Sequence, residues 1–239
     1  MSKNSFFTLQ NNQFPYNKLR FPGQGSDEKI LYVTREHVIF LVYKILFILL
    51  IAVTIIVASV MLNRSFGQVF HNQLLSSILA IGLLVFFVFI LLGVWWVFTL
   101  WKKSVAIVTN KRLIKFIYTT PVNRYNMSLP LEMIVDTSYH NKGFLSSYLN
   151  IGSITARSSA SSSGVATDDV TRVNKKYFYL ENIQYAEDLQ QYLNKLINAL
   201  HKDSSALNDL RPFLPNLKGE EREEFLRENY PQYAKNAKK

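Results

Sequence analysis

One uncharged apolar run, Leu75 to Leu100, constrains this chain more than any other feature. At about 1.5 Å of rise per residue, a helix of this length exceeds the roughly 30 Å of a bilayer's hydrocarbon core. The run closes in tryptophans and two lysines, which are side chains that hold a helix end at the headgroup level. We therefore predict a transmembrane helix over residues 75–101, with Trp95, Trp96 and Trp101 as membrane-interface anchors.

A second apolar run, residues 38–62, comes earlier in the chain and predicts a partner span. Its one charged residue, Lys44, lies near the start and can extend back to the interface, so we count it as a further anchor. Residues 63–74 are expected to form a short turn with one basic residue, whereas the N-terminal flank carries five and the stretch after the second span carries five more. By the positive-inside rule, both termini face the cytoplasm and the turn faces outward. We expect a multi-pass protein of the cell membrane, inner or plasma.

From residue 104 the hydrophobic period changes from helical to two, which is typical of strands. Two alternating runs on either side of Asn110-Lys111 predict a β-hairpin with a tight turn. A short helical turn is expected at residues 144–149, and a small polar loop without a packed conformation at 158–169. The strands that the alternation predicts cover residues 104–109, 113–118, 124–129, 133–140, 153–157 and 175–180.

An amphipathic helix follows the predicted strands, beginning at an Asn182 cap and continuing to His201. Its apolar face includes Leu193, Leu196 and Ile197, which we expect in the core. Residues 102–202 thus predict a cytoplasmic α+β domain, in which a small antiparallel sheet curls against one C-terminal helix.

The two ends of the chain are expected to stand apart from this domain. Residues 1–37 are interpreted as a cytoplasmic N-terminal segment whose last part, Glu28–His37, is a short strand or helix start that lies on the surface and leads into the first span. Residues 203–239 are interpreted as an appendage that is partly helical or disordered, with one short helix at 220–230. That appendage has too few apolar residues to fold alone, so it packs on the domain, frays or docks to a partner.

No pattern of catalytic residues is present. The chain has no cysteine, and therefore no thiolate nucleophile, disulfide or cysteine-ligated metal. It also lacks a glycine-rich phosphate loop, a nucleophile elbow and histidines at metal-ligand spacing. We expect a non-enzymatic protein without catalytic residues, metal or cofactor. The pI of about 9.6 raises the question of nucleic acid, but basic charge beside a membrane has a nearer anionic partner, so no nucleic-acid partner is expected.

Four stretches carry a resemblance to a known family: Asp27–His37, Thr109–Ile114, Ser128–Ile134 and Phe144–Thr155. They resemble the lead-in and the pleckstrin-homology-like (PH-like) domain of bacterial YdbS-like membrane proteins, over roughly residues 21–200. The resemblance implies a two-helix transmembrane hairpin followed by a bent antiparallel β-barrel that a C-terminal helix caps. It fixes no ligand, because function lives in sites placed on folds. Related domains that bind phosphoinositides use a long first hairpin loop, so the short Asn110-Lys111 turn favours a diffuse basic surface over a pocket.

The stretch from Lys102 to Leu131 contains no acidic residue. In one interpretation its first two lysines end the span while the other basic residues solvate strand edges. In the other, all of them form one electropositive face toward anionic headgroups. The candidate lipid-facing residues are Lys102, Lys103, Lys111, Arg112, Lys115 and Arg124.

These patterns predict a membrane-anchored binding or scaffolding module. Its expected partners are the lipid bilayer, including anionic headgroups, and a protein partner or a second copy of the chain. The alternative is an accessory subunit of a membrane transport or secretion complex that acts through the helical hairpin. Gly82 and Gly93 lie roughly on one helix face and would suit close packing with another helix.

Overall fold

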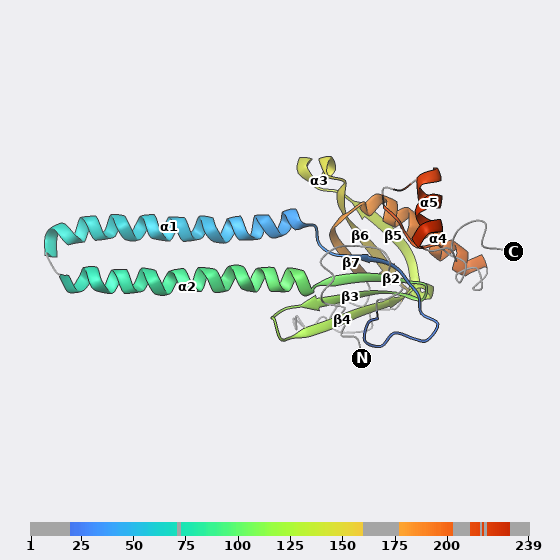
Figure 1. Ribbon diagram of the computed structural model, residues 1–239, viewed down its shortest axis with the longest axis horizontal. Helices are drawn as coiled ribbons and strands as arrows, with labels where there is room; N and C mark the ends of the chain where they lie inside the picture. The colour runs from blue at the N-terminus through green and yellow to red at the C-terminus, as the bar shows by residue number, and fades with distance from the viewer. Residues whose placement is uncertain are drawn as a thin grey trace. The chain divides into compact units, whose positions relative to one another are not determined.

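The computed structural model describes residues 20–70, 73–159, 177–202, 211–215, 217 and 219–229. The described chain is α+β: two long helices, α1 (Val38–Phe70) and α2 (Gln73–Lys103), are followed by antiparallel sheets (Figure 1). It divides into two units. The helical unit is Val38–Trp101 together with Thr119–Asn123, and the globular unit comprises the described residues up to His37, from Lys102 to Tyr118 and from Arg124 onward.

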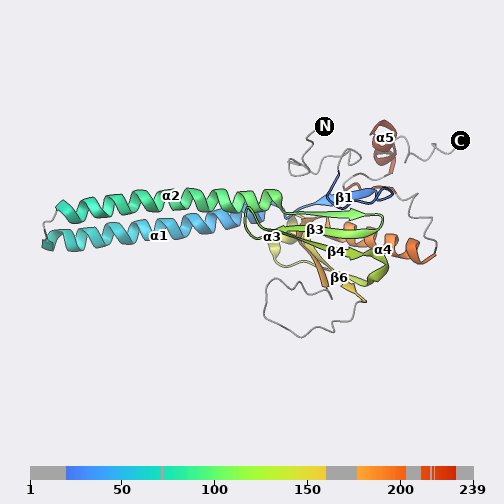
Figure 2. The ribbon, with the colours of Figure 1, turned by 90° about the horizontal axis from the view of Figure 1, so that it is seen from below.

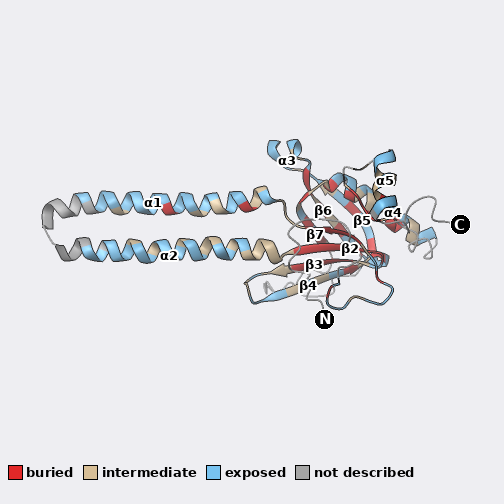
Figure 3. Ribbon diagram, viewed as in Figure 1, coloured by how far each residue is buried: buried red, intermediate tan, exposed pale blue. Residues whose placement is uncertain are grey.

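Both long helices are apolar enough to cross a membrane. Their candidate spans are Val38–Leu62 and Ala80–Lys103, with mean hydropathies of 3.2 and 2.8. Figure 3 shows exposed residues along both helices, and only 6% and 0% of the most apolar windows are buried. A soluble protein would bury such a surface, so two apolar helices able to span a membrane are confirmed.

The expected turn at residues 63–74 is mostly helical instead. The helix α1 continues to Phe70 and α2 starts at Gln73, which leaves only His71 and Asn72 between them, outside the described residues. Residues 63–70 contain no proline, so nothing in them forces the helix to stop where its apolar part ends.

A four-stranded antiparallel sheet has the order β1-β2-β3-β4, where β1 is Ile30–Thr34, β2 Val105–Thr109, β3 Arg112–Tyr118 and β4 Arg124–Pro130. The predicted hairpin around Asn110-Lys111 is therefore present, with Val105 opposite Phe116 and Val108 opposite Leu113. All five residues of β2 are buried, because this strand lies inside the sheet with neighbours on both sides.

A three-stranded antiparallel sheet follows, with β6 (Ile151–Ser158) between β5 (Ile134–His140) and β7 (Tyr177–Gln184). The connections include the short helix α3 (Phe144–Tyr148), close to its predicted position, and the 3₁₀ turn η3 (Leu131–Met133), which was not predicted. The polar loop expected at 158–169 lies outside the described residues from 160 onward, as does the start of the last predicted strand at residues 175 and 176.

The strand β1 corrects the expected domain boundary. Residues 28–37 are not a surface-lying lead-in, since Leu31, Tyr32 and Val33 are buried and β1 pairs with β2 (Figure 2). Thr34 lies opposite Ala106, so the two helices are inserted between two paired strands of one sheet. The sequence signal was ambiguous because β1 has only five residues and its partner strand follows both helices.

The amphipathic helix α4 (Ala186–Lys202) packs its apolar face on the core as predicted. Leu189, Leu193 and Leu196 are fully buried, and Ile197 is nearly so. The cap assignment was wrong, because Asn182 belongs to β7 and the helix begins four residues later. Pairing of β7 with β6 continues through Gln184, so sheet formation overrides the local cap signal.

The C-terminal stretch also joins the globular unit. Phe213 is buried with the core, its ring centroid 4.8 Å from that of Tyr32, and its N–H donates to the Leu31 carbonyl at 3.1 Å. The short helix α5 (Gly219–Asn229) matches the predicted one and buries Leu226 against Leu214. Of the outcomes considered for the appendage, packing on the domain is the one observed for its described residues.

Candidate functional site

Two of the six candidate lipid-facing residues lie where α2 joins the globular unit. Lys102 and Lys103 are the last residues of α2, and β2 begins two residues later. The ammonium of Lys103 lies 5.5 Å from the centroid of the Tyr118 ring, and the Tyr118 N–H donates to Ser104 Oγ at 3.4 Å. These contacts place the end of β3 beside the end of α2.

Arg124 belongs to the same end of the sheet. It lies directly opposite Tyr118 in the β3–β4 pairing, and its guanidinium carbon is 5.7 Å from the centroid of the Phe116 ring. Its side chain is exposed. We call Lys102, Lys103 and Arg124 the junction group, because they gather where the chain leaves α2 for the sheet.

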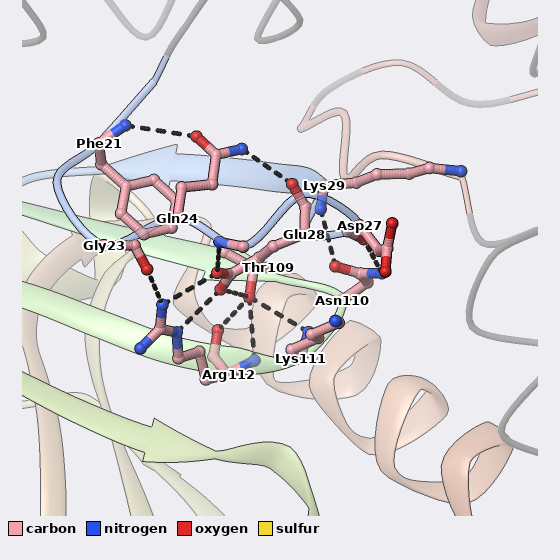
Figure 4. A network of polar contacts seen from close by, with 11 residues as sticks. Phe21, Gly23, Gln24, Asp27, Glu28, Lys29, Thr109, Asn110, Lys111 and Arg112 are labelled. Carbon is pink, nitrogen blue, oxygen red and sulfur yellow. Dashed lines mark hydrogen bonds and ion pairs between the residues drawn. The ribbon is translucent and has the colours of Figure 1, made fainter.

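Arg112 has a different role, as a partner of the buried Glu28 (Figure 4). Its Nε and Nη2 donate to the two carboxylate oxygens, each at 2.9 Å, and Nη2 also donates to the Gly23 carbonyl at 2.6 Å. The guanidinium carbon lies 5.9 Å from the centroid of the Phe21 ring. Such a bidentate pair occupies the donors that would otherwise meet a headgroup.

The β2–β3 turn is tied to the same lead-in by further hydrogen bonds. The Thr109 hydroxyl donates to Glu28 Oε1 at 2.9 Å. Asn110 accepts the Lys29 N–H at 2.8 Å and donates through its side-chain amide to the Asp27 carbonyl at 3.2 Å. Thr109 and Asn110 are both buried, so these polar groups need the partners that they have. This network fastens residues 21–29 onto the turn and is structural.

The Glu28 carboxylate is held ionised by this network. Burial alone would raise the pKa of Glu28, but hydrogen bonds from Arg112, the Gly25 N–H and Thr109, together with the charge of Arg112, lower it below its ordinary value. The pKa of Arg112 is raised by the same carboxylate. Both shifts favour the charged forms, so the pair is an ion pair at neutral pH.

Lys115 is also engaged within the protein. Its ammonium donates to the Tyr179 carbonyl at 2.9 Å and lies 3.9 Å from Glu181 Oε2, and only 21% of its side chain is exposed. Burial lowers the pKa of Lys115, partly offset by the charges of Glu181 and Glu36. Lys115 therefore bridges the two sheets at β3 and β7, and its charge is not available to a bilayer.

Lys111 is exposed but lies at the other end of the sheet from the junction group. It follows β2, and a five-residue strand spans about 17 Å at roughly 3.3 Å per residue. That is about two Debye lengths at physiological salt. The six basic residues thus form no single face. Three make the junction group, Arg112 and Lys115 form ion pairs within the protein, and Lys111 lies in the turn at the other end of the sheet.

The predicted interface anchors lie in the two long helices. Lys44, Trp95 and Trp96 are exposed along α1 and α2, and Trp101 is half-buried. Lys44 is the only charged residue of the span Val38–Leu62, and Trp101 lies one residue before the two lysines that end α2. Tryptophan and lysine are side chains that prefer a headgroup region, so the anchoring role of these four residues stays a prediction.

Within the described residues, no three His, Asp or Glu side chains are grouped closely enough to hold a metal ion. An open hollow of about 780 Å³ lies beside α5, lined by charged side chains of both signs. Arg211 and Glu223 in its wall are paired with each other, which leaves a mixed and self-neutralising surface. This hollow offers no nucleophile with an adjacent base.

Glu28 and Phe213 are the important side chains that sequence reasoning missed. Both belong to stretches interpreted as lying outside the domain. The one available signal for Glu28 was an acidic residue three positions after Gly25, a spacing that suits the carboxylate's acceptance of the Gly25 N–H at 3.1 Å.

Comparison of the chain with protein-family models, with curated proteins and with solved structures finds no match.

Proposed function

We propose that the chain is a membrane-anchored binding or scaffolding module without enzymatic activity, whose helical unit spans a bilayer and whose globular unit works at the cytoplasmic surface. The observation that carries this proposal is the pair of apolar helices with solvent-facing apolar surfaces, inserted between strands β1 and β2. A bilayer is the environment that such helices match. We place it in the cell membrane with both termini cytoplasmic, from the distribution of lysine and arginine.

We propose a PH-like fold for the globular unit. Two antiparallel sheets, of four and three strands, followed by one amphipathic helix that packs against β5 and β6, support it. A bent barrel closed at one end by its C-terminal helix has this order of elements. In this proposal the chain is a YdbS-like protein in which the transmembrane hairpin interrupts the PH-like unit between its first two strands.

The ligand that we propose is the anionic membrane surface, contacted by the junction group. These three cations lie at the covalent exit from α2, where a headgroup layer would lie if α2 spans the bilayer. Each basic residue at an anionic surface contributes about 1 kcal/mol, or roughly a fivefold change in equilibrium. Arg112 and Lys115, which have partners inside the protein, and Lys111, at the far turn, are left out of this face.

The lipid proposal predicts different effects at the two ends of the sheet. In full-length protein in nanodiscs, energy transfer from a dye on Asn126→Cys to a headgroup-labelled lipid should rise with anionic lipid content and fall at high salt. Asn126 is exposed on β4, two residues from Arg124. Arg124→Gln should lower the docked-to-undocked ratio about fivefold, because one cation is lost.

Lys111→Gln is the matched control for this experiment. It removes the same charge from an exposed position at the far end of β2, so the docked fraction should stay unchanged. An equal fall in the docked fraction of Arg124→Gln and Lys111→Gln would mean that docking depends on the net charge of the protein and not on the position of the cation. Docking that ignores salt and Arg124 would argue against the lipid proposal and favour a protein partner at this surface.

The proposed topology predicts one-sided labelling. The chain contains no cysteine, so a single introduced thiol reports one position. On intact cells an impermeant thiol reagent should label Ser65→Cys, which lies in α1 beyond its apolar span, and should not label Ser128→Cys, which is exposed on β4, until the cells are opened. The reverse pattern would overturn the assignment of the cytoplasmic side.

The second candidate function is an accessory subunit of a transport or secretion complex. Its support is that a side chain added at Gly82 or Gly93 would meet no atom within 4 Å, so both positions leave room for another helix. Purification of the full chain from membranes in mild detergent tests it. A partner that is stoichiometric with the wild type and is lost from Gly82→Leu would favour this candidate.

A further inference from the structure

The short helix α3 carries an exposed apolar cluster. The exposed fractions of Phe144, Tyr148 and Leu145 are 85%, 78% and 47%, and the helix has no buried residue. Figure 1 shows α3 as a short coil standing clear of the sheets. Two exposed aromatic rings within five residues form a contiguous apolar tip, which is a feature of interaction surfaces.

The hydrogen bonds of the globular unit link the base of this tip to His37, the last residue of the unit before the chain enters α1. Asn150, just after α3, accepts the Tyr185 N–H at 2.8 Å at the end of β7. Asn182 of β7 accepts the His37 N–H at 2.8 Å, and α1 begins at the next residue, Val38. The tip therefore lies at the end of the globular unit from which the chain leaves for its apolar helix.

The base of α3 is held firmly in this position. Gly152 at the start of β6 has no side chain because a Cβ there would lie 2.3 Å from the Tyr139 ring and 3.1 Å from the Ala186 Cβ. His140 and Ser153 are paired across β5 and β6. The strands on either side of the tip are thus packed into the sheet.

The segment that carries the tip has a basic flank, while Glu36, which accepts from the Asn182 side chain at 3.4 Å, and the exposed Glu187 and Asp188 belong to neighbouring elements. No acidic residue occurs between Thr137 and Thr167, whereas Lys142 is exposed two residues before the helix. Phe and Tyr are side chains that partition to the headgroup region, the tyrosine with its hydroxyl toward water. A basic flank with an apolar tip is the composition of segments that bind the membrane interface.

We infer that Phe144, Leu145 and Tyr148 insert into the headgroup layer of the bilayer that α1 enters, forming a second attachment of the globular unit beside the junction group. This inference rests on the proposed function, because it takes α1 to span a membrane from Val38. The two attachments come from different elements, α3 after β5 and the β3–β4 end of the four-stranded sheet. Together they would fix the orientation of the globular unit, whereas the covalent links alone would allow it to swivel.

The test uses the full chain in vesicles of phosphatidylcholine and phosphatidylglycerol with nitroxide-labelled headgroups. An environment-sensitive dye on Ser147→Cys, exposed within α3, should be quenched by the nitroxide, and the same dye on Val135→Cys should not. Val135 is the matched control because it is an exposed apolar residue near the opposite end of β5. Adding Phe144→Ser and Tyr148→Ser should lower the docked-to-undocked ratio roughly tenfold.

The native tryptophans separate failure of this inference from failure of the proposed function. Quenched Trp95 and Trp96 with an unquenched Ser147 dye would leave the spanning helices intact and overturn the insertion of α3. Unquenched tryptophans would overturn the membrane proposal together with it. A Ser147 dye that is shielded from water but not quenched would show that protein covers the tip, which also contradicts insertion.

Discussion

Leu193→Ala is expected to lower the free energy of unfolding of the globular unit by about 3–4 kcal/mol, because truncating a buried leucine removes apolar contacts and leaves a cavity. Leu193 has no exposed surface and lies in the middle of α4, in the same core as β2, β6 and Phe213. A typical domain has only about 5–15 kcal/mol of stability, so this one change removes a large part of it.

The measurement is a urea titration of the detergent-solubilised full chain, read by short pulses of protease that cut the unfolded globular unit. With a urea dependence of about 2 kcal/mol per molar, the midpoint should fall by roughly 2 M. Gln191→Ala is the control, since that side chain is exposed on the same helix and its loss should leave the midpoint in place. An unchanged midpoint for Leu193→Ala would show that α4 is not part of the core. The full chain is needed because residues 102–202 alone lack both β1 and Phe213.

Arg112→Met is expected to cost about 3 kcal/mol in the same titration. The substitution keeps an apolar stem against Phe21 but leaves the Glu28 carboxylate, 4% exposed, without its bidentate partner. Removing one member of a buried ion pair costs more than the pair itself is worth, since an uncompensated charge remains. The expected cost lies at the low end of the usual range for a broken buried ion pair, because 32% of the Arg112 side chain is exposed.

Lys111→Met is the control for this variant, being an exposed neighbour in the same turn. The pH dependence of the stability difference between wild type and Arg112→Met separates loss of the ion pair from loss of packing. The lowered pKa of Glu28 means that its contribution is complete above the unfolded value of 4.5 and is lost as the pH falls through the folded value. The difference between wild type and Arg112→Met should therefore narrow in acid. A difference independent of pH would show that packing, and not the ion pair, accounts for the loss.

The sequence predicted the elements whose signal is local. The two apolar runs, the hairpin around Asn110-Lys111 and the face of α4 with Leu193 each depend on neighbours within a few residues, and the structure has them at nearly the expected bounds. Their periodicity is a direct result of helix and strand geometry.

The pairs that the sequence did not predict join distant residues. Lys29 and Asn110 are 81 positions apart, and Glu28 and Arg112 are 84 apart. No periodicity connects such residues, so Arg112 could be read only as one more cation in an acid-free stretch. Lys115 could not be set apart for the same reason: net charge is visible in a sequence, whereas the partner that neutralises each charge is not.

Because both long helices are inserted between β1 and β2, β1 is synthesised well before the strand that it pairs with. At roughly 5–20 residues per second, the ribosome needs several seconds between Glu28 and Arg112. Throughout that interval the apolar residues of β1 lack β2, the strand that they pair with in the sheet, and such a segment invites pairing with another chain. The first strand is closed into its sheet only after α2 has been made. A nascent chain that stalls within the helices is therefore left with an exposed β1, which is a site that chaperones and proteases can recognise.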